Sequence, residues 1–109
     1  MIVSEQITQT IGEMKQVCNL LWQCDEKAYQ EFEQYCADWM NVINQAVTEF
    51  SIWAKENEDI PLDIIFQQIR NLENALKEKD DFMLADTLQY EISNMLEYYL
   101  EMAGEYGRE

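Results

Sequence analysis

The sequence of 109 residues contains no histidine. Histidine is the base of Ser-His and Cys-His dyads and a ligand in most zinc sites and in the Glu-x-x-His motif of di-iron bundles, so its absence excludes these chemistries. A glycine-rich phosphate-binding loop is also missing, which excludes nucleotide binding by that route. We therefore expect a protein that is not an enzyme and that has no catalytic residue, no metal site and no cofactor.

Proline occurs once and glycine three times, so turns should be few and the elements between them long. No apolar run approaches the ~20 residues of a membrane span, and residues 1–10 lack the basic start and apolar stretch of a signal peptide. Three cysteines without a Cys-x-x-Cys pair suit a reducing compartment. We expect a cytoplasmic protein that does not insert into a membrane.

Basic residues are scarce: seven lysines and arginines stand against 22 aspartates and glutamates, for a net charge of −15. Binding to a phosphate backbone or to an anionic membrane surface requires cations that this chain lacks. We therefore expect no nucleic acid and no membrane as partner. A basic protein would be attracted from a distance.

Apolar residues are plentiful, at 48% of the chain, and include three tryptophans, six tyrosines and four phenylalanines. So much apolar surface argues against disorder, and the length suits one core and one domain over 1–109.

Helical spacing of apolar residues runs through most of the sequence. The first series predicts a helix over about 4–23, with Ser4 as N-cap and Glu5 near the positive end of the helix dipole. The pattern then falters near Asp25, which is suited to cap a second helix over about 26–56; a continuous or kinked helix is the alternative, because no glycine or proline lies there. The two series are Ile7, Ile11, Met14, Cys18 and Leu21, then Phe32, Cys36, Trp39, Ile43, Ala46, Phe50 and Trp53.

The second half of the chain predicts two more helices. Pro61, with acidic neighbours, marks the start of one that continues through the series 62–76. Asp80 or Asp81 caps the last helix, over about 81–103, and Gly104 and Gly107 end it, leaving a frayed tail over 103–109. Its apolar series is Ala85, Leu88, Ile92, Met95, Tyr99 and Met102.

These elements predict an all-α protein, an antiparallel bundle of about four helices. The short connection near Asp80 makes the last two helices antiparallel neighbours. Because residues 25–56 form a long segment, a long kinked helix or a helix-swapped dimer is the alternative arrangement.

Two groups of residues suggest chemistry. Asp86 with Glu91, and Glu97 with Glu101, place carboxylates on related helix faces, for which we expect a solvated surface rather than a site. Cys18 and Cys36 lie on the apolar stripes and should pack in the core. Cys24, near the predicted break and Lys27, is the cysteine whose reactivity is worth testing.

Aromatic residues beyond the needs of the core suggest binding. Exposed aromatic and methionine side chains are preferred anchors for partner helices. We predict Trp22, Trp53, Tyr90 and Tyr98 as partner-binding residues; filling the flanks of the core or closing a homodimer is the structural alternative.

Residues 76–91 read LKEKDDFMLADTLQYE. This segment resembles a recurrent stretch, with the pattern KD…LAD.L.YE, that opens the last helix of a bundle in small uncharacterised helical proteins of Gram-positive anaerobes. In shape and charge the whole chain is similar to flagellar export chaperones, acidic bundles that hold a terminal helix of their client. Asp86 and Tyr90 share a helix face in this segment and suit either a polar helix–helix contact or a partner-facing patch.

The leading hypothesis is a non-enzymatic, chaperone-like interaction module that binds a partner helix in a groove flanked by the last helix. A structural or regulatory homodimer is the second. The third is an acidic mimic of nucleic acid that binds a basic protein.

Overall fold

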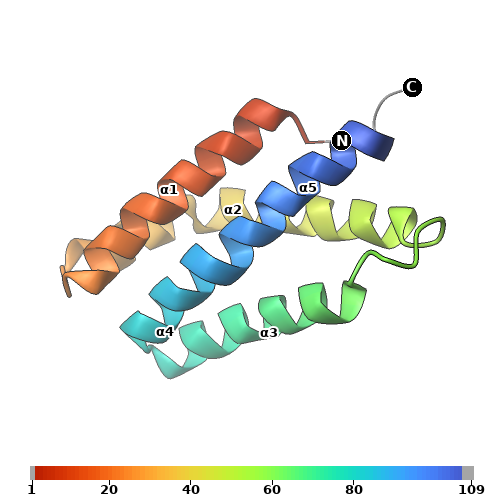
Figure 1. Cartoon of the computed structure of the whole chain (residues 1–109). Helices are drawn as coiled ribbons and strands as arrows, with labels where there is room; N and C mark the ends of the chain where they lie inside the picture. Colours follow the sequence, from red (N-terminus) through yellow and green to blue (C-terminus); the bar gives the residue numbers. More distant parts are fainter. Residues whose placement is uncertain (1, 107–109) are drawn as a thin grey trace.

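The computed structural model describes residues 2–106, and no strand occurs in this part of the chain. The predicted all-α bundle is confirmed, with four helical rods that pack within one chain (Figure 1). The elements are α1 (Ser4–Trp22), α2 (Lys27–Trp53), α3 (Leu62–Glu78), α4 (Asp81–Asp86), a π-helical turn η1 (Thr87–Ile92) and α5 (Ser93–Tyr106).

The long rod formed by α4, η1 and α5 lies at the centre of the bundle. It contacts α1, α2 and α3. In Figure 1 its α5 part runs between α1 and α3, with α2 behind. This central position explains why both flanks of the rod bury apolar residues, where a helix with one neighbour would bury one stripe.

The first helix starts one residue earlier than a Ser4 cap requires, so that prediction is wrong. Val3 is the N-cap, in an extended conformation, and its carbonyl accepts from the amides of Gln6 and Ile7. Ser4 is already helical. Glu5 lies in the first turn, where its charge stabilises the helix dipole.

Between α1 and α2 the chain breaks sharply without glycine or proline, so the kinked continuous helix does not form. Cys24 takes a left-handed conformation with φ 53°. The amides of Cys24 and Asp25 donate to the carbonyls of Leu21 and Leu20, the two bonds of a Schellman motif. The Asp25 side chain then accepts from the Lys27 amide at 2.9 Å, near the start of α2.

The connection from α3 to α4 has the same design. Lys79 is left-handed with φ 53°, and the amides of Lys79 and Asp80 donate back to Leu76 and Ala75. Asp80 is the N-cap of α4, because its carboxylate accepts from the Met83 amide at 3.0 Å. The predictions of a cap at Asp80 and of antiparallel neighbours here are confirmed.

These two left-handed residues lead to a stability prediction. A residue with a Cβ costs about 1–2 kcal/mol in this conformation. Glycine avoids this cost, but it loses more conformational entropy on folding, which offsets part of the gain. We expect Cys24→Gly and Lys79→Gly each to raise the free energy of unfolding by about 0.5–1 kcal/mol in urea denaturation. As a control, glycine at Lys77, inside α3, should lower it by about 1 kcal/mol. Equal changes in the free energy of unfolding at the three positions would contradict the strain assigned to the two left-handed residues.

The last helix is longer than predicted. Gly104 lies inside α5, which continues to Tyr106, so the tail predicted over 103–109 is wrong for 103–106. The Tyr106 ring stacks on Trp53, 5.7 Å away, and this contact holds the final turn of the helix against the core. Gly107 and the rest of the predicted tail lie outside the described residues.

The π-turn η1 corrects a shift in the apolar pattern. Each residue of an α-helix turns by about 100°. On a regular helix, the buried side chains of α5 would therefore point in a direction rotated around the axis by somewhat less than about 100° from those of α4. The wide turn absorbs one extra residue and realigns the two sets. The Ser93 hydroxyl donates to the Leu88 carbonyl at 2.7 Å inside this turn. The buried residues are Leu84, Ala85, Thr87, Leu88, Ile92, Ser93, Met95, Leu96 and Tyr99.

Candidate partner-binding surface

Trp53 is a core residue, so its prediction as a partner anchor is corrected. Its side chain is 9% exposed. The ring stacks on Tyr99 and Tyr106 at 5.3 and 5.7 Å, and it meets the edge of Phe50 at 5.9 Å. The helical spacing already placed Trp53 on the apolar stripe of α2, and packing against α5 completes its burial.

Tyr98 lies at the boundary between this aromatic cluster and solvent. Its ring stacks on the buried Phe50 at 5.6 Å. Burial, followed by the charges of Asp59, Glu101 and Glu105, raises the pKa of Tyr98. The predicted anchor therefore has an apolar side fixed on the core and a hydroxyl in an acidic environment.

A groove runs beside Tyr98 between α3 and α5, and we call it the α3–α5 groove. It encloses about 330 Å³. The Ile64 side chain in its wall is 58% exposed. The other residues that line it are Asp59, Pro61, Ile65, Gln68, Asn94, Met95 and Tyr98.

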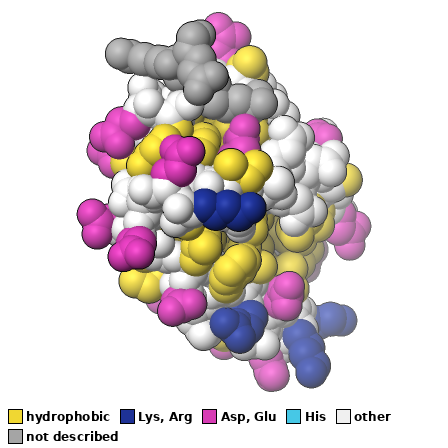
Figure 2. All heavy atoms as spheres, turned by 90° about the vertical axis from the view of Figure 1, so that its right-hand side faces the viewer, with side chains coloured by type: hydrophobic (Ala, Val, Ile, Leu, Met, Phe, Trp, Pro, Cys, Tyr) yellow, Lys and Arg dark blue, Asp and Glu magenta, His cyan; other side chains and the backbone are white. Residues whose placement is uncertain are grey.

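Figure 2 looks onto the end of the molecule where α2 connects to α3. Hydrophobic side chains gather in the middle of this face around a basic side chain, and acidic side chains surround them, with further basic side chains at the lower edge. Among residues at this end, Ile52 and Ile64 are 55% and 58% exposed. An apolar centre with a polar rim is the usual arrangement of a protein-binding surface.

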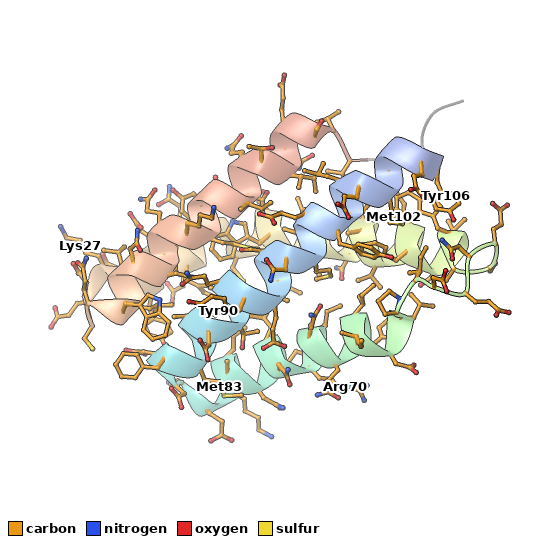
Figure 3. All side chains as sticks on the ribbon, in the orientation of Figure 1. Lys27, Arg70, Met83, Tyr90, Met102 and Tyr106 are labelled. Carbon is orange, nitrogen blue, oxygen red and sulfur yellow. The ribbon has the colours of Figure 1, made fainter. Side chains whose placement is uncertain are left out.

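Tyr90 is 58% exposed on the π-turn, where Figure 3 shows it on the same rod as Met83. Its carbonyl accepts from the Asn94 side chain at 2.7 Å. Asp86, four residues before Tyr90, is also exposed, so this pair faces solvent and makes no helix–helix contact in the described chain. Tyr90 and Asn94 separate Asp86 from Glu97, so this face is not the unbroken row of carboxylates that mimicry of a phosphate backbone needs.

Trp22 lies at the opposite end of the bundle, where α1 ends and α4 begins. Its ring is 41% exposed and stacks on Phe82 at 5.6 Å. Its indole N–H donates to the Gln89 side chain at 3.1 Å. With Phe82 at 53% and Met83 at 36% exposure, these residues form what we call the end patch: Trp22, Phe82 and Met83.

The structure thus separates the four predicted anchors. Tyr98 lies in the α3–α5 groove, Trp22 in the end patch, Tyr90 on the rod that both surfaces share, and Trp53 in the core. Sequence reasoning missed Ile64 and Phe82. Ile64 lies off the apolar series of α3, and an aliphatic residue off the stripe was the signal for exposure.

The paired carboxylates differ in exposure. Asp86, Glu97 and Glu101 are exposed, and Glu91 accepts from the Asn71 side chain at 2.7 Å. No three acidic or cysteine side chains in residues 2–106 come together in a way that would hold a metal ion.

The cysteines differ in environment. Cys18 is buried, as predicted, and burial raises the pKa of its thiol to about 11. Cys36 is half-buried against the core, and Cys24 is exposed in the α1–α2 turn.

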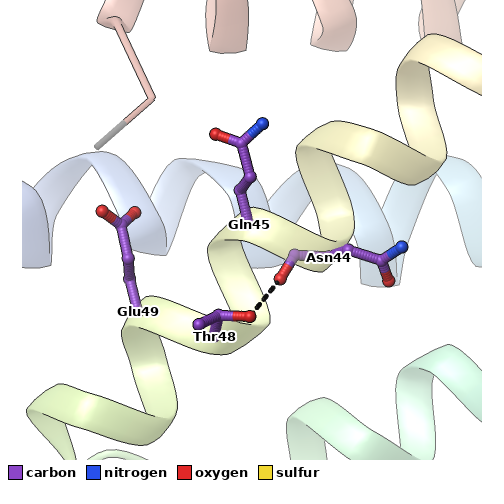
Figure 4. Close-up of a pocket in the computed structure, with 4 residues that line it drawn as sticks. All are labelled: Asn44, Gln45, Thr48 and Glu49. Carbon is purple, nitrogen blue, oxygen red and sulfur yellow. Dashed lines mark hydrogen bonds between the residues drawn. The ribbon is translucent and has the colours of Figure 1, made fainter.

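A shallow depression on the outer face of α2 encloses about 310 Å³ (Figure 4). Its side chains come from one helix and are polar: Asn44, Gln45, Thr48 and Glu49. The Thr48 hydroxyl donates to the Asn44 carbonyl at 2.9 Å, and Glu49 accepts from the Tyr99 hydroxyl. With three of its four residues exposed on a single helix, the depression offers little to a ligand.

A second hollow, of about 480 Å³, lies between the start of α2 and the end of α3 beside Tyr29. The Tyr29 hydroxyl donates to Asp81 at 2.6 Å. Burial, this hydrogen bond and the charges of Asp81 and Asp80 raise the pKa of Tyr29 to about 12. The contact ties α2 to the start of α4.

The Tyr29 contact leads to a prediction of alkaline sensitivity. A tyrosine has a pKa of about 10 in the unfolded chain, so the raised value in the fold stabilises the protein below about pH 10, and this contribution is lost as pH rises through about 12. We expect the free energy of unfolding to fall over this interval in urea titrations, and Tyr29→Phe to reduce the fall. Superimposable pH curves for the two proteins would contradict the prediction.

In the described part of the chain, no helix combines the length and apolar character needed to cross a membrane. No protein-family model, no curated protein and no solved structure matches the chain.

Proposed function

We propose that this protein is a non-enzymatic interaction module that binds a helix of a protein partner in the α3–α5 groove. The observation that carries the proposal is the exposed Ile64 beside Tyr98, in a groove between two helices. A helix–helix groove with apolar walls presents ridges into which a third amphipathic helix packs.

The groove also has the stiffness that recognition needs. Tyr98 rests on Phe50, which is fully buried, so its ring is held in place before a partner arrives. Met95 and Ile65 in the floor are 3% and 2% exposed and belong to the core. A preformed apolar surface reduces the entropy lost on binding.

The test is a tagged pull-down from the native host at low salt, comparing Ile64→Gln with Ile52→Gln. The two isoleucines are 58% and 55% exposed, and Ile52 does not line the groove, so the pair is matched for surface and charge. Burial of one isoleucine is worth about 1.5–3 kcal/mol, so Ile64→Gln should weaken the retained partner more than about tenfold. Ile52→Gln should retain it.

Equal retention by both variants, with unchanged thermal unfolding, would overturn the groove as the site. Recovery of only the protein itself from the host would count against an interaction module and favour self-association.

The end patch supports a second candidate function, a structural or regulatory homodimer. Phe82 and Trp22 stack in solvent, and such a pair is suited to pack against a copy of itself across a twofold axis. Light scattering at micromolar concentration should then report a dimer that Phe82→Ser dissociates. A strict monomer would reject this candidate.

A further inference from the structure

We infer that the helix bound in the α3–α5 groove is a cationic amphipathic helix, whose apolar side chains contact Ile64 and Tyr98 and whose lysine or arginine lies against Glu101 and Glu105. This inference rests on the proposed function and names the chemistry of the partner. Its basis is the distribution of charge along the groove.

One face of α5 carries the acidic groups. Tyr98, Glu101 and Glu105 follow one another at i, i+3 and i+7, so the two carboxylates continue the line of the groove beyond the Tyr98 ring. Both carboxylates are exposed. Asp59, from the α2–α3 connection, faces the same hydroxyl, and its charge acts on Tyr98 together with theirs.

The part of α4, η1 and α5 that the structure describes carries no cation. Residues 80–107 contain no lysine or arginine. The described residues that line the groove likewise include no basic side chain. The carboxylates therefore gather beside an apolar groove without a counter-charge from the rod that bears them.

Their position on the helix is unfavourable in the free protein. Glu101 and Glu105 lie in the last two turns of α5, near the negative end of the helix dipole, where cations are preferred. They are also like charges at i and i+4, which repel. A cation on a bound helix would relieve both effects, so the free energy gained on binding includes this relief.

The aromatic ring adds to the same preference. Lysine and arginine are attracted to the face of a tyrosine, most strongly where water is partly excluded. Tyr98 is half-buried, stacks with one face on Phe50, and lines the groove. A basic amphipathic helix thus matches the groove in both apolar contact and charge, whereas an acidic helix would be repelled.

The test uses a synthetic helical peptide of about 18 residues, long enough to form a helix on binding. Leucines at i, i+3, i+4 and i+7 form one face, and arginines flank it. A control peptide replaces each arginine by glutamate. Tryptophan and tyrosine fluorescence or calorimetry at low salt should show the arginine peptide binding at least about tenfold more tightly than the glutamate peptide.

The matched variants of the protein are the double substitutions Glu101→Gln with Glu105→Gln, and Glu73→Gln with Glu78→Gln. Both remove two negative charges, but Glu73 and Glu78 lie on α3 and are not among the charges that act on Tyr98. The first pair should weaken the arginine peptide about fivefold to tenfold, and the second less than about twofold. The first pair should also raise the midpoint of thermal unfolding, because it removes the repulsion at the end of α5.

Equal weakening by the two pairs, or no binding of the arginine peptide at millimolar concentration, would overturn the cationic inference. If Ile64→Gln loses a native partner while the glutamine pairs do not, the groove remains the site and the inference alone fails. If Ile64→Gln retains that partner, the proposed function fails, whatever the charge variants do.

Discussion

Phe50→Ala is expected to lower the free energy of unfolding by about 3–5 kcal/mol. Phe50 is fully buried, and its ring contacts Trp53, Tyr98 and Tyr99 at 5.9, 5.6 and 5.7 Å. Removing it leaves a cavity that three large rings cannot fill without moving. Since a domain of this kind is stabilised by about 5–15 kcal/mol in total, much of the stability should be lost.

Urea denaturation followed by circular dichroism measures this loss. Phe66→Ala is the matched control, because it removes the same group from a side chain that is 40% exposed on α3. It should cost less than about 1 kcal/mol. Similar costs at the two positions would mean that the aromatic cluster does not organise the core.

The same substitution should also damage binding. Tyr98 rests on Phe50, so its ring loses the support that holds it at the groove. We expect Phe50→Ala to weaken the arginine peptide even at temperatures where the variant stays folded. Stability of the core and function of the groove are linked at this one ring.

Deleting Tyr90 is expected to leave the bundle folded, whereas deleting Glu97 should abolish cooperative unfolding. Both residues are exposed on the central rod, so neither deletion removes core volume. Tyr90 lies in the π-turn, where one residue is in excess of a regular helix. Its removal converts the turn to α-helix and keeps the buried residues on both sides aligned.

Glu97 lies in regular α-helix. Its removal rotates the rest of α5 by about 100° relative to the residues before it. Tyr99 would then leave the core, with its hydrogen bonds to Glu49 and to the Ile2 amide. Thermal unfolding followed by circular dichroism distinguishes the two outcomes, and equal loss of cooperativity would contradict the role assigned to the π-turn.

The rod of α4, η1 and α5 contributes both to the core and to the α3–α5 groove. Its inner residues form the core, its end carries Glu101 and Glu105, and its Tyr98 lies at the boundary. A bundle with an acidic, apolar-floored groove is suited to hold a basic helix reversibly, because the ionic part of the attraction weakens with salt while the apolar part remains.

Local signals in the sequence determined most of the secondary structure. The Asp80 cap and the helix start after Pro61 depend on side chains that act within a few residues, and each appears in the structure. The helical spacing determined the all-α class, because apolar residues at intervals of three and four fit no other element. The absence of cations in residues 80–107 is also a property of the sequence alone.

Tertiary structure decided which aromatic residues face solvent. Trp53, on the apolar stripe of α2, packs against α5, whereas Tyr98, beside the stripe of the last helix, opens onto the α3–α5 groove. The π-turn and the extension of α5 to Tyr106 also depend on partners far along the chain, namely the neighbouring helices and the Trp53 ring. The periodicity of the sequence indicates how apolar a helix face is. Whether that face is buried depends on which other helix covers it, and this is determined by the packing of the bundle.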